Sequence, residues 1–163
     1  MQVEVFDGVA LASQGDTILM LWKGGSRVHR LRWVFEKIEE LLRVQPTFAV
    51  MQVILPSSQT PDADARTLIA RELTRLRPKM RRLVTVPVGS SVRMSLVRAI
   101  IRAVATLTGL SDIQVIVEDV DTGIQRLLER AGPQTPGGQA LADAMTALYA
   151  ALAETPTAGA ASR

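Results

Sequence analysis

Hydroxyl side chains gather between an apolar run and a helical pattern in ILPSSQTPDADA, residues 54–65. Ser57, Ser58 and Thr60 could carry a phosphoryl group or bind an anion, because free amide groups at a helix start favour negative charge. They also suit an ordinary helix start, in which a hydroxyl caps the first amides and acids follow in the first turn. Structural, regulatory and catalytic roles are all open. We predict that the three hydroxyls lie in an exposed loop and that Thr60 is the cap.

A second pair of hydroxyls, Ser90 and Ser91, follows a glycine and precedes another helical pattern. The turn matches neither a phosphate-binding loop nor a dinucleotide fingerprint, so helix capping is its expected role. In open α/β sheets, ligands usually bind beyond the carboxyl ends of the parallel strands. We expect the loops at residues 56–60, 89–91 and 118–121 to gather there, and this edge is the best candidate for a regulatory or anion-binding site.

Cations cluster without an acid in RLRPKMRR, residues 75–82. They are Arg75, Arg77, Lys79, Arg81 and Arg82. Such a run can bind nucleic acid or an acidic protein surface, because its charges neutralise phosphates or carboxylates. Cations near the end of a helix also complement the helix dipole, and the run has no aromatic side chain on which bases could stack. Nucleic acid is therefore the least favoured partner.

Composition removes several kinds of catalytic site. The chain has no cysteine, so it has no thiolate nucleophile and no disulfide, and its single histidine, His29, cannot form a multi-histidine metal site. Its place among arginines in a helical pattern is more typical of a surface residue than of a catalytic base. Glu118, Asp119 and Asp121 could hold a hard cation, yet Asp121 is also the expected cap of the next helix. We expect no metal, no cofactor and no enzymatic activity.

Length and hydropathy indicate one globular domain with a tail. The 163 residues are too few for two ordinary domains, and 47% apolar residues are enough for a core. No apolar run reaches the roughly 20 residues that cross a bilayer, and the N-terminal residues lack the pattern of a signal peptide. A cytoplasmic protein is the expectation.

Apolar periodicity predicts alternating strands and helices. A hairpin at Gly15-Asp16 leads into a strand at residues 18–22, and later strands are expected at residues 48–55, 82–88 and 113–117. A helical pattern follows each of the four strands at residues 18–22, 48–55, 82–88 and 113–117. Their expected starts are Ser26, Thr60 or Pro61, Ser90 or Ser91, and Asp121. The third helix, up to Leu107, has the widest apolar face and is expected to be the most buried.

This order of elements resembles the STAS domain of bacterial anti-sigma-factor antagonists, the SpoIIAA-like fold. The resemblance covers residues 3–132 and implies an α/β fold, with an open mixed sheet of about five strands and four helices. It further implies a bacterial regulatory or scaffold domain that acts by protein–protein interaction. In that family a hydroxyl at the start of the second helix is phosphorylated to control binding; Ser57, Ser58 and Thr60 match the position, although the Asp-Ser pattern is absent. A small enzyme or a nucleotide-binding protein using the same loop edge is the alternative.

Residues 133–163 are expected to follow the domain of residues 1–132 as a Pro/Gly linker, a helix over residues 139–153 and a disordered tail. The helix carries an apolar seam of the kind that packs on another helix. The seam consists of Leu141, Met145, Leu148 and Leu152. Its own domain, a second copy in a homodimer, or a foreign protein could cover it. The first two are favoured, because an exposed seam would promote aggregation.

Overall fold

Six strands form one mixed sheet in the computed structural model, which describes residues 1–155. In chain order, which is also their order in the sheet, they are β1 (Gln2–Phe6), β2 (Val9–Gln14), β3 (Thr17–Trp22), β4 (Phe48–Ile54), β5 (Met80–Pro87) and β6 (Gln114–Ile116). The pairs β1–β2 and β2–β3 are antiparallel, and β3 to β6 run parallel. The predicted α/β fold is confirmed, with six strands instead of about five. The additional strand is β1, whose alternating pattern is too short to stand out in the sequence.

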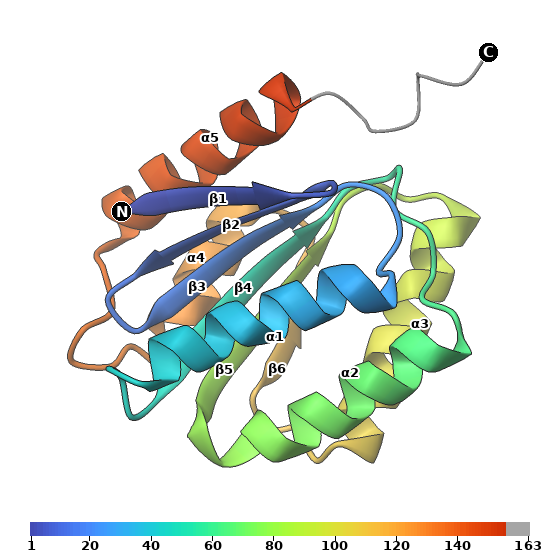
Figure 1. The fold of residues 1–163 in the computed structure, drawn as a ribbon, viewed down its shortest axis with the longest axis horizontal. Coiled ribbons are helices and arrows are strands. Elements are labelled where there is room, and N and C mark those ends of the chain that lie inside the picture. The colour runs from blue at the N-terminus through green and yellow to red at the C-terminus, as the bar shows by residue number, and fades with distance from the viewer. Residues whose placement is uncertain (156–163) are drawn as a thin grey trace.

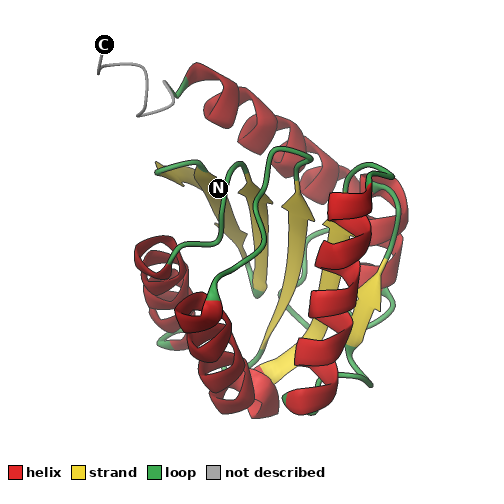
Figure 2. Cartoon of the chain, turned by 90° about the vertical axis from the view of Figure 1, so that its right-hand side faces the viewer, coloured by secondary structure: helices red, strands yellow, loops and turns green. Residues whose placement is uncertain are grey.

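Helices cover both faces of the sheet (Figure 1). They are α1 (Val28–Leu42), α2 (Ala63–Leu76), α3 (Val92–Leu107), α4 (Val120–Leu128) and α5 (Gly138–Glu154), with a short 3-10 turn at Arg77–Lys79. Helices α1, α2 and α3 lie on one face and α4 and α5 on the other, as the turned view in Figure 2 also shows. No helix within residues 1–155 is long and apolar enough to cross a membrane.

The start of α2 differs from the prediction. Asp62, not Thr60, is the N-cap, and its carboxylate accepts a hydrogen bond of 2.8 Å from the amide of Ala65. A carboxylate forms a stronger, charge-assisted bond with helix amides than a hydroxyl does, and this favours the later start. The predicted cap of α3 is confirmed, because Ser91 accepts a hydrogen bond from the third amide of that helix.

Two further cap predictions were wrong. The N-cap of helix α1 is Arg27, which forms no side-chain cap. The predicted cap, Ser26, lies one residue before it. Helix α4 is capped by Asp119, whose carboxylate accepts both the amide and the hydroxyl of Thr122, at 2.7 and 2.8 Å. Asp121 instead lies in the first turn, where its charge complements the helix dipole. The acidic cluster around residue 119 therefore has a capping function.

Helix α3 is not the most buried helix. Only Met94, Val97 and Ala105 on this helix are buried, whereas Val92 is 89% exposed and Leu107 is 80% exposed. Its apolar surface is wider than the side that faces the sheet, so part of that surface points to solvent.

Helix α5 packs on the sheet of its own chain. All four residues of the predicted seam, from Leu141 to Leu152, are buried, at 0–3% exposure, in one cluster with residues of β2 to β5 and α4. Small residues on this face, such as Ala10 and Ala12 of β2, let the helix approach closely. Disorder was predicted for the tail of residues 155–163, of which residues 156–163 lie outside the described part of the chain.

Replacing Leu148 with alanine should lower the free energy of unfolding by about 2–5 kcal/mol, because the side chain is fully buried between α5 and the sheet. Denaturant unfolding measures the change. Tyr149→Ala is the control, since this neighbour is 39% exposed and should cost much less. Equal losses for the two variants would show that α5 does not pack in this way.

Candidate functional site

The loops after β4 and β5 meet at the carboxyl edge of the parallel strands, as expected for these two of the three loops. The amide of Val88 donates to the carbonyl of Ile54 at 2.9 Å, which joins the ends of the two strands. A Cβ placed on Gly89 would lie 3.6 Å from the ring of Pro56, in ordinary contact. The two loops therefore form one surface at the point where α2 and α3 begin.

Ser58 is buried in this edge, contrary to the prediction of an exposed loop. It is 4% exposed, and its hydroxyl donates a hydrogen bond of 3.0 Å to the carbonyl of Trp22 at the end of β3. The loop turns back toward the sheet, because the Ser58 amide also donates to the carbonyl of Leu55. The Ser58 hydroxyl thus anchors the loop, whereas Ser57 is exposed and Thr60 is half-buried.

A shallow hollow separates this loop from the first turns of α3. It is lined by Gln59, Thr60, Val92, Arg93 and Leu96. Ser90 and Ser91 are exposed beside it. The hollow joins the predicted loop to the exposed side of α3, where no site residue was predicted.

From the hollow, an outward stripe of apolar residues runs along α3. It consists of Val92, Leu96, Ala99, Ala103 and Leu107, all exposed and spaced three or four residues apart. This spacing places them on one side of the helix. The sequence contained the signal, since the apolar pattern of this helix is unusually wide.

Arginines border the outward stripe. Arg93 and Arg102 are exposed on opposite sides of it, and α3 contains no acidic residue. Within residues 1–155 neither of these two arginines forms an ion pair. Arg98 instead donates to the carbonyls of Pro87 and Gly89, at 3.0 and 2.8 Å, and so holds the loop before α3. The exposed side of α3 is therefore both apolar and positively charged.

The basic run from Arg75 to Arg82 does not form one patch. Arg75 pairs with Glu39 and Glu72, Arg77 with Asp112, Arg81 with Asp16, and Arg82 with Glu129. Lys79 is exposed. Four of the five cations are thus neutralised by carboxylates of the same chain, in contacts that point in different directions from the end of α2 and the start of β5. The run has little charge to offer to a phosphate backbone.

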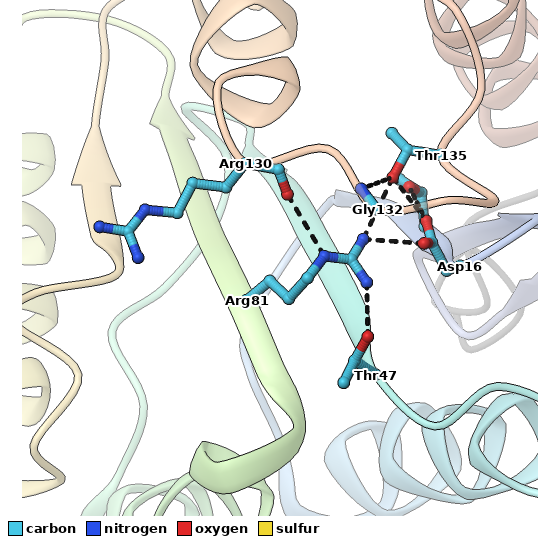
Figure 3. A network of polar contacts seen from close by, with 7 residues as sticks. Asp16, Thr47, Arg81, Arg130, Gly132 and Thr135 are labelled. Carbon is cyan, nitrogen blue, oxygen red and sulfur yellow. Dashed lines mark hydrogen bonds and ion pairs between the residues drawn. The ribbon is translucent and has the colours of Figure 1, made fainter.

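Sequence reasoning missed a network at the opposite edge of the sheet (Figure 3). Asp16 lies in the turn before β3, and its carboxylate, 3% exposed, lies 2.9 Å from the Arg81 guanidinium. Thr135 donates a hydrogen bond of 2.7 Å to the same carboxylate. Arg81 also donates to the hydroxyl of Thr47 at 2.7 Å and to the carbonyl of Arg130 at 3.2 Å. These contacts, the latch, fasten the segment before α5 to two strands.

The latch leaves no room for a Cβ at two glycines unless its contacts shift. A Cβ on Gly132 would collide with the Asp16 carboxylate and with the Arg81 guanidinium. Gly15 has a positive φ of 58°, and a Cβ there would collide with the backbone of Gln134. The latch is a structural contact, because its polar groups are satisfied by one another.

A second polar cluster fastens the β1–β2 turn to α1. The carboxylate of Asp7 accepts one hydrogen bond from Arg30 at 2.8 Å and interacts with the His29 ring at 2.6 Å. These two interactions lower the pKa of Asp7 from 3.8 to about 2, and the hydrogen bond from Arg30 has the larger effect. Arg30 also donates to the carbonyl of Gly25. His29 is half exposed, and its contact with Asp7 gives it a structural role.

Comparisons with known proteins concern the fold. No protein-family model matches the chain, and a search of curated proteins gives no significant match. Among solved structures, the anti-sigma factor antagonist SpoIIAA in its unphosphorylated form is similar, with 14% sequence identity and a TM-score of 0.46. The match covers 80% of this chain and 98% of that one. Any function must therefore be inferred from the chain's own residues.

Replacing Arg81 with methionine should lower the free energy of unfolding by about 3 kcal/mol, because it leaves the buried carboxylate of Asp16 without its cation. The double variant Asp16→Asn/Arg81→Met should recover part of this loss, since the unpaired charge is then removed as well. Denaturant unfolding of the single and double variants measures the coupling. Strictly additive losses would contradict the ion pair.

Asp7 should make stability depend on pH in acid. Its pKa is about 2 in the folded chain and close to 3.8 in the unfolded chain, so its contribution is fully present above about pH 4 and is lost as the pH falls toward 2. Asp7→Asn is the matched variant, because asparagine tolerates the positive φ of 42° at this residue. The stability difference between parent and variant should shrink from pH 5 to pH 2. A constant difference would contradict the assignment.

Proposed function

We propose that this chain is a non-catalytic domain that acts by binding another protein through the outward stripe of α3 and the adjoining hollow. The exposure of that stripe carries the proposal. Helices on a protein surface normally direct charged residues outward, yet Val92, Leu96 and Leu107 are 89%, 53% and 80% exposed. Contiguous apolar surface of this kind marks an interaction site.

The charges beside the stripe define the partner. Arg93 and Arg102 border it and have no carboxylate partner within residues 1–155, so a partner with acidic residues around an apolar ridge would be complementary. A homodimer through the same stripe would bring arginines of two copies together, and like charges at an interface are unfavourable. A foreign, acidic partner is therefore favoured over a second copy. An amphipathic helix is the simplest ligand with these features.

The loop of Ser57 and Thr60 gives this surface a means of regulation. Thr60 lines the hollow together with Arg93, and Ser57 is exposed in the same loop. A phosphoryl group on Thr60 would add negative charge beside Arg93 and compete with the acidic residues of a partner. Ser58 is not suited to this role, because its hydroxyl is buried against the carbonyl of Trp22.

Two designed helical peptides test the proposal. Both carry one leucine stripe, flanked by glutamates in the first peptide and by lysines in the second. Fluorescence anisotropy should show binding of the glutamate peptide at least about tenfold tighter than that of the lysine peptide, because only the first complements the arginines. The double variant Leu96→Asp/Leu107→Asp should lose at least about tenfold in affinity for the glutamate peptide.

Val44→Asp is the control for these variants, because Val44 is 75% exposed outside α3. It should bind the glutamate peptide like the parent. The proposal is overturned if Leu96→Asp/Leu107→Asp binds the glutamate peptide as tightly as the parent does. It is also overturned if the parent binds both peptides with equal affinity. It is also overturned if sedimentation shows a dimer that the leucine substitutions dissociate, since the stripe would then be an interface between copies.

A further inference from the structure

Strand β1 forms one edge of the sheet and has a neighbouring strand on one side alone (Figure 1). The strand at the other edge, β6, has only three residues, whereas β1 has five. An edge strand presents a row of backbone N–H and C=O groups to which another extended chain can add. Short edge strands resist such addition, so β1 is the edge at which it is favoured.

The hairpin between β1 and β2 determines which backbone groups of β1 point outward. Its turn consists of Asp7 and Gly8, whose positive φ angles of 42° and 83° are typical of a two-residue hairpin turn. Phe6, the last residue before this turn, therefore forms a hydrogen-bonded pair with β2, and bonded positions alternate along the strand. The N–H and C=O groups of Val3 and Val5 consequently point away from β2.

These outward backbone groups are accessible to a second strand. Both valines are half-buried, and no backbone group outside the sheet pairs with either of them within residues 1–155. Their side chains pack on the cluster beneath α5, so this helix covers one face of β1. An added strand would pair two N–H and two C=O groups.

An aromatic shelf lies on the other face, between the end of β1 and α1. Phe6 is 38% exposed, and its ring stacks on that of Trp33, with 5.4 Å between the ring centroids. The His29 ring lies 6.0 Å from Phe6 at a steep angle. Cross-strand pairs between aromatic side chains are stabilising, so an aromatic residue opposite Phe6 would be favoured in an added strand.

Glu4 determines the charge of a suitable partner. Lys37 of α1 lies between two carboxylates, 2.8 Å from that of Glu4 and 3.1 Å from that of Glu40. One ammonium group between two carboxylates leaves an excess of negative charge beside the middle of β1. A cation opposite Glu4 would be favoured, because opposite charges on neighbouring strands stabilise their pairing.

The same carboxylate disfavours a second copy of the chain at this edge. Two β1 strands that pair antiparallel along all five residues, through the groups of Val3 and Val5, would place the two Glu4 carboxylates opposite each other. Like charges directly opposite are unfavourable, and a charged residue is a common protection of an edge strand. A foreign, cationic strand is therefore favoured over self-pairing.

We propose that β1 binds an extended segment of another protein as an additional strand, with a cation opposite Glu4 and an aromatic residue opposite Phe6. Helix α3 packs over β5, toward the other end of the sheet, so this edge is separate from the outward stripe (Figure 1). The edge and the stripe would select partners of opposite charge. A domain with both surfaces would join two different proteins.

Two peptides test the proposal. The first contains FVKVT between Gly-Ser flanks, which in the antiparallel direction places phenylalanine opposite Phe6 and lysine opposite Glu4; in the second, glutamate replaces lysine. Fluorescence anisotropy with the intact chain should show the lysine peptide binding about three- to tenfold tighter, as expected for a favourable against an unfavourable cross-strand pair. Glu4→Gln should remove most of this preference. Glu39→Gln is the matched control on α1, because Glu39 pairs with Arg75 instead, and should retain it.

Methylated peptides distinguish strand addition from contact through side chains alone. N-methylation of either valine in the lysine peptide removes an amide that would donate to β1 and should abolish binding. N-methylation of the central lysine is the matched control, because its amide points away from β1, and should have little effect. Hydrogen exchange followed by NMR should slow at the amides of Val3 and Val5 when the lysine peptide is added. The amides of Glu4 and Phe6 should not change, because β2 already protects them.

Three outcomes would overturn the proposal. The first is that the parent binds neither peptide, or both with equal affinity. The second is that methylation of the valines and methylation of the lysine weaken binding equally. The third is that Leu96→Asp/Leu107→Asp abolishes binding of the lysine peptide, since this would place the peptide on α3.

Discussion

The buried ion pair of Asp16 and Arg81 is the contact on which one half of the structure depends. It joins the turn before β3 to the start of β5, and Thr135 brings the segment before α5 to the same carboxylate. The chain can then return over the sheet, because the start of α5 is fixed beside the strands that the helix covers. A buried carboxylate is costly unless it is paired and hydrogen-bonded, so the contact specifies one path for the segment from Gly132 to Thr135. The apolar seam of α5 supplies the burial that stabilises this path.

The two faces of the sheet differ in how their helices pack. Alanines of β2 and Gly123 of α4 let α4 and α5 approach the strands closely, and the side chains there leave little space. Large side chains such as Met20 and Trp22 hold α1, α2 and α3 farther from the opposite face, and a cavity remains. The close-packed face provides stability. On the other face the helices pack less closely on the strands.

Apolar periodicity predicted most of the elements, because strands and helices bury side chains with different periods. It also identified the seam of α5 from Leu141 to Leu152, since spacing alone defines it. The caps were less predictable, because several hydroxyls and carboxylates stand near each helix start and their bonds depend on local geometry. The burial of Ser58 could not be predicted, because its hydroxyl bonds to the carbonyl of Trp22, which is far away in the sequence. The latch was out of reach, because its hydrogen bond from Thr135 to Asp16 spans 119 positions and neither residue is distinctive in the sequence.

Helix α3 shows why amphipathic pattern alone could not place the candidate site. Its apolar pattern is unusually wide, and this width was interpreted as deep burial although it is equally the signal of an exposed apolar side. In the structure its inner side, with Val97, Ile101 and Val104, lines the cavity, while Leu96 on its outer side belongs to the stripe and the hollow. A helix moves as a rigid element, so any change in its distance from the sheet displaces both sides together.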